Sequence, residues 1–430
     1  MLASLRSNWF AVRASYWFYP ALFSLAGLAL ALGLVHLDRT GATAWLANAH
    51  WIIPARPDGA SNMLTVLAGS VIGVASTVFS ITIAAVAYAS GTFGPRLLNN
   101  FMEDKGNQFS LATFVGTFVY AISVLQSVRT AGDQDLAFVP QASLALASCL
   151  MLLCVAVLVY FLHHVPDSIR INSVLEAIGR RLLEEAASRF PEEGTAEARM
   201  AEWPMGTVVK AQAAGYIRVI DFDHLVGVAR TVDMPIWLMA RPGDFVSAGV
   251  PLVMAGTDAV PDPVAAQIRR AFALGGTRTP EQDLEFSIDE LVEITLRALS
   301  PAVNDPFTAV NALHWLGAAT SLIGQRDLDR DAWNEPVADC PVAPLRDGFD
   351  HFLARGLGSV RSGVATSPIA CLVAFDTFRS AALQVSSATR REQVLRETDL
   401  LLEQARLHLV GPDLEQVIER HQTVRKGRST

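Results

Sequence analysis

Residues 142–162 read ASLALASCLMLLCVAVLVYFL and contain no aspartate, glutamate, lysine or arginine. An α-helix needs about 20 mostly apolar residues to cross the roughly 30 Å hydrocarbon core of a bilayer. Within lipid, a helix also pairs nearly all of its backbone amides and carbonyls inside its own segment. A run of this length and composition is therefore predicted to be a transmembrane helix.

Three further runs of the same kind precede it along the chain. They cover about 17–37, 63–89 and 109–128, and none has a charged residue in its interior. Hydrophobic residues make up 51% of the 430 residues, and the excess lies in this N-terminal part. Four long uncharged helices within residues 1–165 are not expected in the core of a soluble protein. These residues are predicted to form a four-helix transmembrane domain in contact with the lipid bilayer.

Basic residues that flank the four spans predict how they are oriented. Arg6 and Arg13 precede the first span, Arg96 and Lys105 lie between the second and third, and Arg170 follows the fourth. Short cytoplasmic segments carry an excess of lysine and arginine. The N-terminus and the large C-terminal region are therefore both expected in the cytoplasm.

The second span carries a stripe of small and hydroxyl-bearing residues at helical spacing: Gly69, Gly73, Ser76, Thr77, Ser80 and Ala84. Such a stripe lets two helices pack closely in lipid. A second interpretation is that the stripe is the wall of an uncharged, hydroxyl-lined pore in an oligomer. The spans contain no charged residue that could relay protons or sense voltage, which disfavours a proton-coupled carrier.

The rest of the chain is predicted to be a cytoplasmic region of mixed α/β structure. Val174, Ile178 and Leu182 recur at helical spacing and predict an amphipathic connecting helix within 166–200. Residues 201–260 contain short β-prone runs separated by glycine and proline, which indicates a small β-rich module. Residues 261–430 are expected to be mainly helical.

Two sets of capping signals punctuate the helical part. Thr279-Pro280-Glu281-Gln282 has the pattern of a capping box and predicts a helix that begins at Pro280. Ser300-Pro301 is expected to end that helix. Asp305 followed by Pro306 then predicts the start of the next one, with Asp305 as its cap.

Three groups of polar residues are candidates for a site. Glu285, Asp289 and Glu293 fall on one face of the helix predicted from Pro280, where they form either a solvated face or a contact for a cation. Around the predicted corner that follows, Arg297, Ser300, Asn304 and Asp305 form either a purely structural turn or a contact for a ligand or a second subunit. The same two interpretations apply to Arg241 and Asp244, which bound the turn Arg241-Pro242-Gly243-Asp244.

Several of these stretches resemble one known family. They are RALSPAVNDPFTA at 297–309, Gly215-Tyr216-Ile217, Arg241-Pro242-Gly243-Asp244-Phe245 and Asp283-Leu284-Glu285-Phe286. In their order along the chain they are similar to the domain-of-unknown-function family 2254 of predicted bacterial integral membrane proteins, over nearly the whole chain. The resemblance implies a protein of the bacterial inner membrane with several N-terminal spans. It implies no activity, ligand or catalytic residue.

The chemical motifs narrow the function mainly by exclusion. A net charge of −8 argues against nucleic acid as a partner, because phosphate binding needs clustered cations. The sequence has no GxxxxGK[ST], HExxH or GxSxG motif, and its four cysteines include no CxxC pair. We expect no catalytic residues, no bound cofactor and no metal site.

Two functional hypotheses from different classes remain. The first is a homo-oligomeric channel or transport-like pore, lined by the second span and gated or assembled by the cytoplasmic region. The alternative is a membrane-anchored sensor or scaffold, whose cytoplasmic region binds a small ligand, an ion or a partner protein. An enzyme ranks third, because no nucleophile and base can be named.

Overall fold

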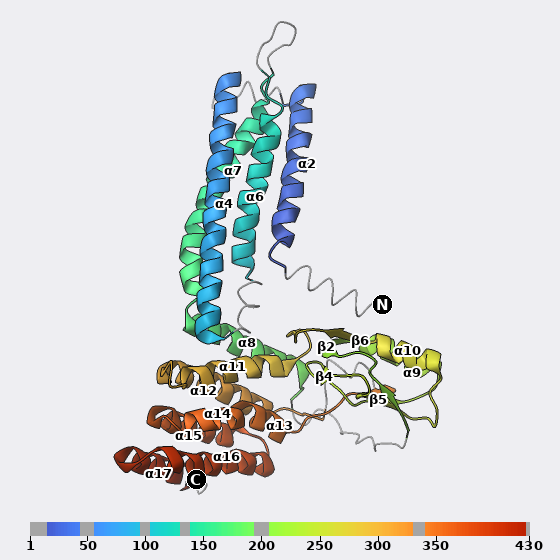
Figure 1. Ribbon diagram of the computed structural model, residues 1–430, viewed down its shortest axis with the longest axis vertical. Helices are drawn as coiled ribbons and strands as arrows, with labels where there is room; N and C mark the ends of the chain where they lie inside the picture. The colour runs from blue at the N-terminus through green and yellow to red at the C-terminus, as the bar shows by residue number, and fades with distance from the viewer. Residues whose placement is uncertain are drawn as a thin grey trace. The chain divides into compact units, whose positions relative to one another are not determined.

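The computed structural model describes residues 15–43, 56–94, 104–129, 138–192, 206–329 and 340–426 (Figure 1). The chain divides between Arg170 and Ile171 into two compact units. Arg6, Arg13 and Arg96, which contribute to the predicted orientation, lie outside the described residues. Each unit is considered by itself below.

The first unit contains the predicted membrane helices. They are α2 (Phe18–Thr40), α4 (Pro57–Phe93), α6 (Lys105–Leu125) and α7 (Gln141–Ser168). Each has a segment long and apolar enough to cross a membrane. This confirms the four predicted spans, although α4 and α7 extend beyond the apolar runs into more polar sequence. The helix α7 continues through Pro166, near its C-terminal end.

Helix-end contacts fix how α2, α6 and α7 run within this unit. Asp38, near the C-terminal end of α2, accepts hydrogen bonds from the backbone N–H groups of Ala142 (3.2 Å) and Ser143 (3.0 Å). It thereby caps the positive N-terminal end of α7. At the opposite end of the bundle, Asp104 caps α6 and lies 2.8 Å from the ring of His164 in α7. The start of α2 and the end of α7 therefore lie at the same end of the bundle.

The second unit begins with α8 (Ile171–Arg189), inside the predicted range 166–200. Its strands form two small sheets. One has the order β1 (Thr207–Lys210), β5 (Pro251–Ala255), β3 (Ile236–Leu238) and β7 (Val342–Ala343). The other has the order β4 (Phe245–Val246), β2 (Gly215–Ile220) and β6 (Phe272–Gly275).

The two sheets share one hydrophobic core with the helices α9 (Phe222–Thr231) and α10 (Asp262–Arg270). Ile217, Leu225, Ile236, Val253 and Ile268 are completely buried in it. The β part is not confined to the predicted range 201–260, because β6 and β7 lie beyond it. The strand β7 pairs in parallel with β3, and such long-range pairing is not visible in a local pattern.

The remaining helices stack in layers on the side of this unit opposite the strands (Figure 1). They are α11 (Leu284–Ala298), α12 (Pro306–Ile323), α13 (Phe349–Leu353), the π-helical turn η1 (Ala354–Gly358), α14 (Ser359–Val364), α15 (Pro368–Gln384), α16 (Ala388–His408) and α17 (Gly411–Lys426). The four N-terminal apolar helices followed by this mixed α/β region confirm the predicted fold class. The predicted cap also holds, since Asp305 accepts from the N–H of Thr308 (3.1 Å) and Pro306 is the first residue of α12.

The predicted capping box at Thr279 is wrong. The helix α11 begins at Leu284, and its cap is Asp283, which accepts from the N–H of Phe286 (3.1 Å). The side chain of Gln282 instead pairs with the backbone of Ile220 in β2, accepting from its N–H (2.8 Å) and donating to its carbonyl (3.3 Å). The side chain of Gln282 therefore bonds to a strand from elsewhere in the chain, and not to the helix end that the local pattern predicts.

Candidate functional site

Charged side chains gather where the β part of the second unit meets its helices. We call this group the junction cluster, and it consists of Arg241, Arg278, Asp283, Glu285, Asp289, Asp347, His351 and Arg355. The residues come from the turn between β3 and β4, from the start of α11 with the loop before it, and from α13 with its flanking segments. All of these residues are buried or half-buried.

The turn between β3 and β4 brings Arg241 into the cluster. The backbone N–H of Arg241 donates to Asp244 Oδ2 (3.0 Å), which closes the turn. Gly243 has φ +94, and a Cβ atom at this position would lie 2.3 Å from Asp283 Oδ2. Only glycine combines this backbone conformation with so close an approach. The predicted turn therefore also holds the β part against the start of α11.

The first turns of α11 supply three of the carboxylates. Asp283 and Glu285 are only 2% and 8% exposed. Asp283 receives the guanidinium of Arg278, with Nε at 2.8 Å. Asp289, one turn further along α11, also contacts Arg278 (2.5 Å). Buried carboxylates of this kind are tolerated only when they are paired and hydrogen-bonded.

The π-helical turn η1 brings in the third arginine. Arg355 reaches from this turn to Glu285 (2.8 Å) and Asp289 (2.8 Å) at the same time. Single π-helical turns are rare and occur frequently at functional sites, because the extra residue redirects a side chain. Here the redirected side chain connects two carboxylates one helical turn apart on α11.

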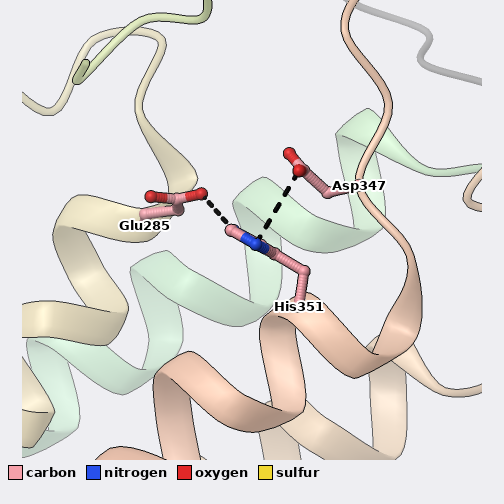
Figure 2. Close-up of side chains that lie close together, drawn as sticks. All are labelled: Glu285, Asp347 and His351. Atoms are coloured by element: carbon pink, nitrogen blue, oxygen red, sulfur yellow. Dashed lines mark hydrogen bonds and ion pairs between the residues drawn. The ribbon is translucent and has the colours of Figure 1, made fainter.

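His351 lies between two carboxylates, as Figure 2 shows. Its Nε2 is 2.6 Å from Glu285 Oε1, and its Nδ1 is 3.8 Å from Asp347 Oδ1. Arg241 contacts the same two carboxylates. A doubly protonated imidazole can donate from both nitrogens, so this arrangement favours the charged form of His351.

The pKa values of the cluster reflect these contacts. The hydrogen bond to Glu285 raises the pKa of His351, partial burial opposes this, and Asp347 raises it further. Burial raises the pKa of Glu285, but the hydrogen bond from His351 and the charges of Arg355 and Arg241 outweigh it and bring that pKa to about 2. For Asp283, burial prevails over Arg278 and raises the pKa to about 6.

Glu285, Asp347 and His351 also offer the ligand types of a metal site, with potential ligand atoms within 4.8 Å of one another. Arg241 contacts both of these carboxylates, and Arg355 contacts Glu285. A divalent cation would therefore sit beside two guanidinium groups, at a strong electrostatic disadvantage. The arrangement fits a histidine held by ion pairs better than it fits a metal centre.

The predicted cation contacts on α11 separate in the structure. Glu285 and Asp289 belong to the junction cluster, where the cations that they contact are arginines and His351. Glu293 lies further along the helix and pairs with Arg297 (3.8 Å).

The contacts described for the residues of the α11–α12 corner stabilise the turn itself. The Ser300 hydroxyl donates to the carbonyl of Arg297 (2.6 Å). Asn304 has φ +49, a left-handed conformation that asparagine tolerates, and Asp305 caps α12. The corner lies outside the junction cluster, and a ligand or subunit contact there stays a prediction.

Sequence reasoning missed Arg278, Asp347, His351 and Arg355 as members of a site. Asp347, His351 and Arg355 recur at four-residue spacing, which alone indicates only one face of a helix, while Arg278 lies far from them and none belongs to a motif. Arg355 lies in the π-helical turn η1, which has no clear signature in the local sequence. Only the distance between segments in space identifies them.

The small-residue stripe of α4 is exposed among the described residues of this unit. All six residues of the stripe are exposed, and a Cβ on Gly69 or Gly73 would meet nothing within 4 Å. The close helix approach in this unit is instead between α2 and α6, where a Cβ on Gly27 would lie 2.5 Å from the carbonyl oxygen of Gly116. Packing among the described residues of this unit therefore does not explain the stripe.

Replacing His351 with glutamine is expected to change how stability depends on pH. Because the folded-state pKa of His351 is raised, its stabilising contribution is fully present below its unfolded pKa of about 6.5 and is lost as pH rises through the folded value. The variant should lose about 1–2 kcal/mol at acidic pH and less at alkaline pH. Unfolding of the full chain in detergent, measured at pH 5.5 and pH 8.5, checks this.

The exposed His314 on α12 provides the control for this measurement. His314→Gln should leave stability nearly unchanged at both pH values. A loss for His351→Gln that is the same at pH 5.5 and pH 8.5 would show that the imidazole is not charged in the cluster.

Comparison with known proteins identifies the family to which the sequence is similar. Residues 13–380 match the family described as "Predicted membrane protein (DUF2254)". The chain is 30% identical over 359 residues to uncharacterized proteins of Mycobacterium bovis (strain ATCC BAA-935 / AF2122/97) and Mycobacterium tuberculosis (strain ATCC 25618 / H37Rv). Each alignment covers 81% of this chain and 68% of the relative. No solved structure matches the chain.

Proposed function

The chain belongs to the DUF2254 family of predicted membrane proteins, and on this premise we propose that it forms a homo-oligomeric channel in the bacterial inner membrane. In this proposal α4 of each copy lines the conducting path. The observation that carries it is the exposed stripe of small and hydroxyl-bearing residues on α4.

The surface of α4 is divided along its length into distinct faces. Leu64, Leu67, Val71 and Val78 are buried against the other helices of the unit. The small-residue stripe lies on the opposite side of the helix, as the 100° rotation per residue requires. Ile72, Phe79 and Ile83 form a neighbouring exposed stripe of large apolar side chains. That apolar stripe suits lipid, and the small stripe suits either another helix or water.

The hydroxyl groups of the stripe suit an uncharged aqueous path. Ser76 donates to the carbonyl of Ile72 (3.0 Å), Thr77 to that of Gly73 (3.1 Å) and Ser80 to that of Ser76 (2.8 Å). Each oxygen keeps lone pairs that can accept from water or a solute. A wall without charged groups holds no ion tightly, so we expect passage of small polar solutes or hydrated ions with weak charge selectivity.

Cysteine substitution tests the aqueous path directly. In a chain whose four native cysteines are replaced, Ser76→Cys, Thr77→Cys and Ser80→Cys should react with a charged, membrane-impermeant thiol reagent. Ile72→Cys, on the same helix but in the apolar stripe, is the matched control and should react far more slowly. Liposomes that contain the intact protein should also pass small solutes, and modification of Ser80→Cys should reduce that flux.

Two outcomes would contradict the channel. One is stripe cysteines that are no more reactive than Ile72→Cys in a folded protein. The other is Gly69→Cys that gives no disulfide-linked dimers in membranes, because the proposal places this face of neighbouring copies close together around one axis.

In the proposed orientation, the end of the bundle that holds the start of α2 and the end of α7 faces the cytoplasm. The start of α2 and the end of α7 share one end of the bundle, and the basic residues predicted to flank the spans favour that end. A C-terminal reporter that is active only in the cytoplasm checks this placement.

The junction cluster favours a second candidate function, a cytoplasmic sensor attached to the membrane. His351 of α13 contacts Glu285 of α11 and lies near Asp347 of the segment before α13, so its protonation changes the attraction between these elements. Any flux should then depend on pH between about 5.5 and 8.5 in the wild type and lose that dependence in His351→Gln. Equal pH dependence in both proteins would count against a sensor that acts through this histidine.

A further inference from the structure

A groove of about 540 Å³ lies between α8, α12 and α15, within the second unit. It is separate from the junction cluster, with which it shares no residue. The polar residues that matter for its chemistry are His314, Ser321, Gln325, Asp376, Thr377 and Gln384. A volume of this size is typical of pockets that hold small organic ligands.

The floor of the groove is formed where α12 and α15 approach closely. A Cβ on Gly317 would lie 2.1 Å from the methyl group of Thr377, so glycine is needed at this crossing. The lining residues recur every three or four positions on both helices, which aligns them along the groove. Leu183 of α8 and Leu322 of α12 supply apolar contacts at its walls.

Two hydroxyl groups in the groove are not used by the protein. Ser321 and Thr377 are only 5% and 8% exposed, and their side-chain hydroxyls make no hydrogen bond with any residue that the structure describes. The neighbouring Thr320 shows the usual solution, since its hydroxyl donates to the carbonyl of Leu316 (2.8 Å). Buried polar groups nearly always have a partner. The hydroxyl oxygens of Ser321 and Thr377 are open to the groove, so their partners come from what fills it, which is water when no ligand is bound.

The other polar groups define the chemistry that would be recognised. Gln325 donates through Nε2 to the carbonyl of Ser321 (3.0 Å), and Gln384 donates through Nε2 to Ser380, so each glutamine presents its side-chain carbonyl as an acceptor. Asp376 is ion-paired with Arg420. No lysine or arginine lines the groove, so an anion has no counter-charge there.

From these observations we infer that the groove binds an uncharged polyhydroxylated molecule of the saccharide or polyol class. Hydroxyl groups both donate and accept, as the glutamine carbonyls and the two free hydroxyls together require. The C–H surface of a sugar packs on Leu183 and Leu322. Within the channel hypothesis this gives the cytoplasmic region a ligand, although the inference does not depend on a channel.

The test is binding of maltose, trehalose and sorbitol to the purified full chain in detergent, followed by hydrogen exchange of segments 314–325 and 376–384. At least one of these probes should bind saturably and protect both segments. The double variant Ser321→Ala/Thr377→Val removes two hydrogen bonds of about 1 kcal/mol each, so it should weaken binding by roughly thirtyfold.

Two further variants keep the result interpretable. Thr320→Val removes a hydroxyl that is already bonded within α12, and its affinity should equal that of the wild type. Ala318→Phe fills the groove without removing a polar group and should abolish binding even if the double variant fails to fold. The inference is overturned if the folded wild type binds none of the three probes, or if Thr320→Val weakens binding as much as the double variant does. Competition of phosphate or spermidine for the same segments would likewise reject an uncharged ligand.

Discussion

Replacing Glu285 with glutamine is expected to lower the free energy of unfolding by about 3–5 kcal/mol, because it removes the central negative charge from a nearly buried network. Glu285 contacts His351 (2.6 Å), Arg355 (2.8 Å) and Arg241 (3.3 Å), and none of these side chains is fully solvated. Glutamine keeps the shape of the side chain but leaves the three cations under-compensated. The pKa of His351 should also fall, since its bond to Glu285 is the main cause of the upward shift.

Chemical unfolding of the full chain in detergent at pH 7 measures the loss. Hydrogen exchange should locate it, with faster exchange at the start of α11 and in the turn that holds Arg241. Glu293→Gln is the matched control on the same helix, since Glu293 pairs with Arg297 at a more exposed position. We expect the control to lose less than about 1 kcal/mol. Equal effects of the two substitutions would show that the junction cluster adds no more to stability than the half-buried pair of Glu293 and Arg297.

Acid should weaken the same network, and the sign follows from the shifted pKa of Glu285. A carboxyl group with a folded-state pKa of about 2 contributes stability that is fully present above its unfolded value of about 4.3 and is lost as pH falls towards 2. Asp283 acts in the opposite sense. Its pKa is raised to about 6, so its ionisation works against the fold as pH rises through the interval between its unfolded value and 6.

Replacing Gly243 with alanine is expected to cost about 3 kcal/mol or more, from two separate causes. The left-handed backbone at φ +94 is unfavourable for any residue with a Cβ, at about 1–3 kcal/mol. The added methyl group would also lie 2.3 Å from Asp283 Oδ2 and must displace that side chain, at a further cost of about 1–3 kcal/mol. Displacing Asp283 disturbs both its bond to Arg278 and the cap of α11.

Gly249→Ala separates the two causes. Gly249 has nearly the same conformation, φ +95, but a Cβ there meets nothing within 4 Å. This control should therefore lose only the backbone part, and the difference between the two variants measures the close approach to Asp283. Equal losses would mean that the turn yields without moving Asp283, and that it does not hold the β part against α11.

The sequence by itself determined the features that depend on local chemistry. The apolar runs predict the four membrane helices, because an uncharged segment of about 20 residues has few alternatives to spanning a bilayer. The start of α12 was equally predictable, since Asp305 and Pro306 satisfy the first turn of the helix without help from the rest of the chain. The turn at Gly243 belongs to the same class, because its composition specifies its backbone.

Only the tertiary structure decided which distant groups meet. Gln282 had a good local role at a helix end, yet it pairs with the backbone of β2, because a buried strand edge needs partners more than a solvated helix end does. His351 and Glu285 lie on different helices, and no periodic pattern connects them. The exposed stripe of α4 illustrates the same limit. Its composition can be read from the sequence, but its exposure among the described residues of the membrane unit is a property of packing, because α2 and α6 meet through their own glycines.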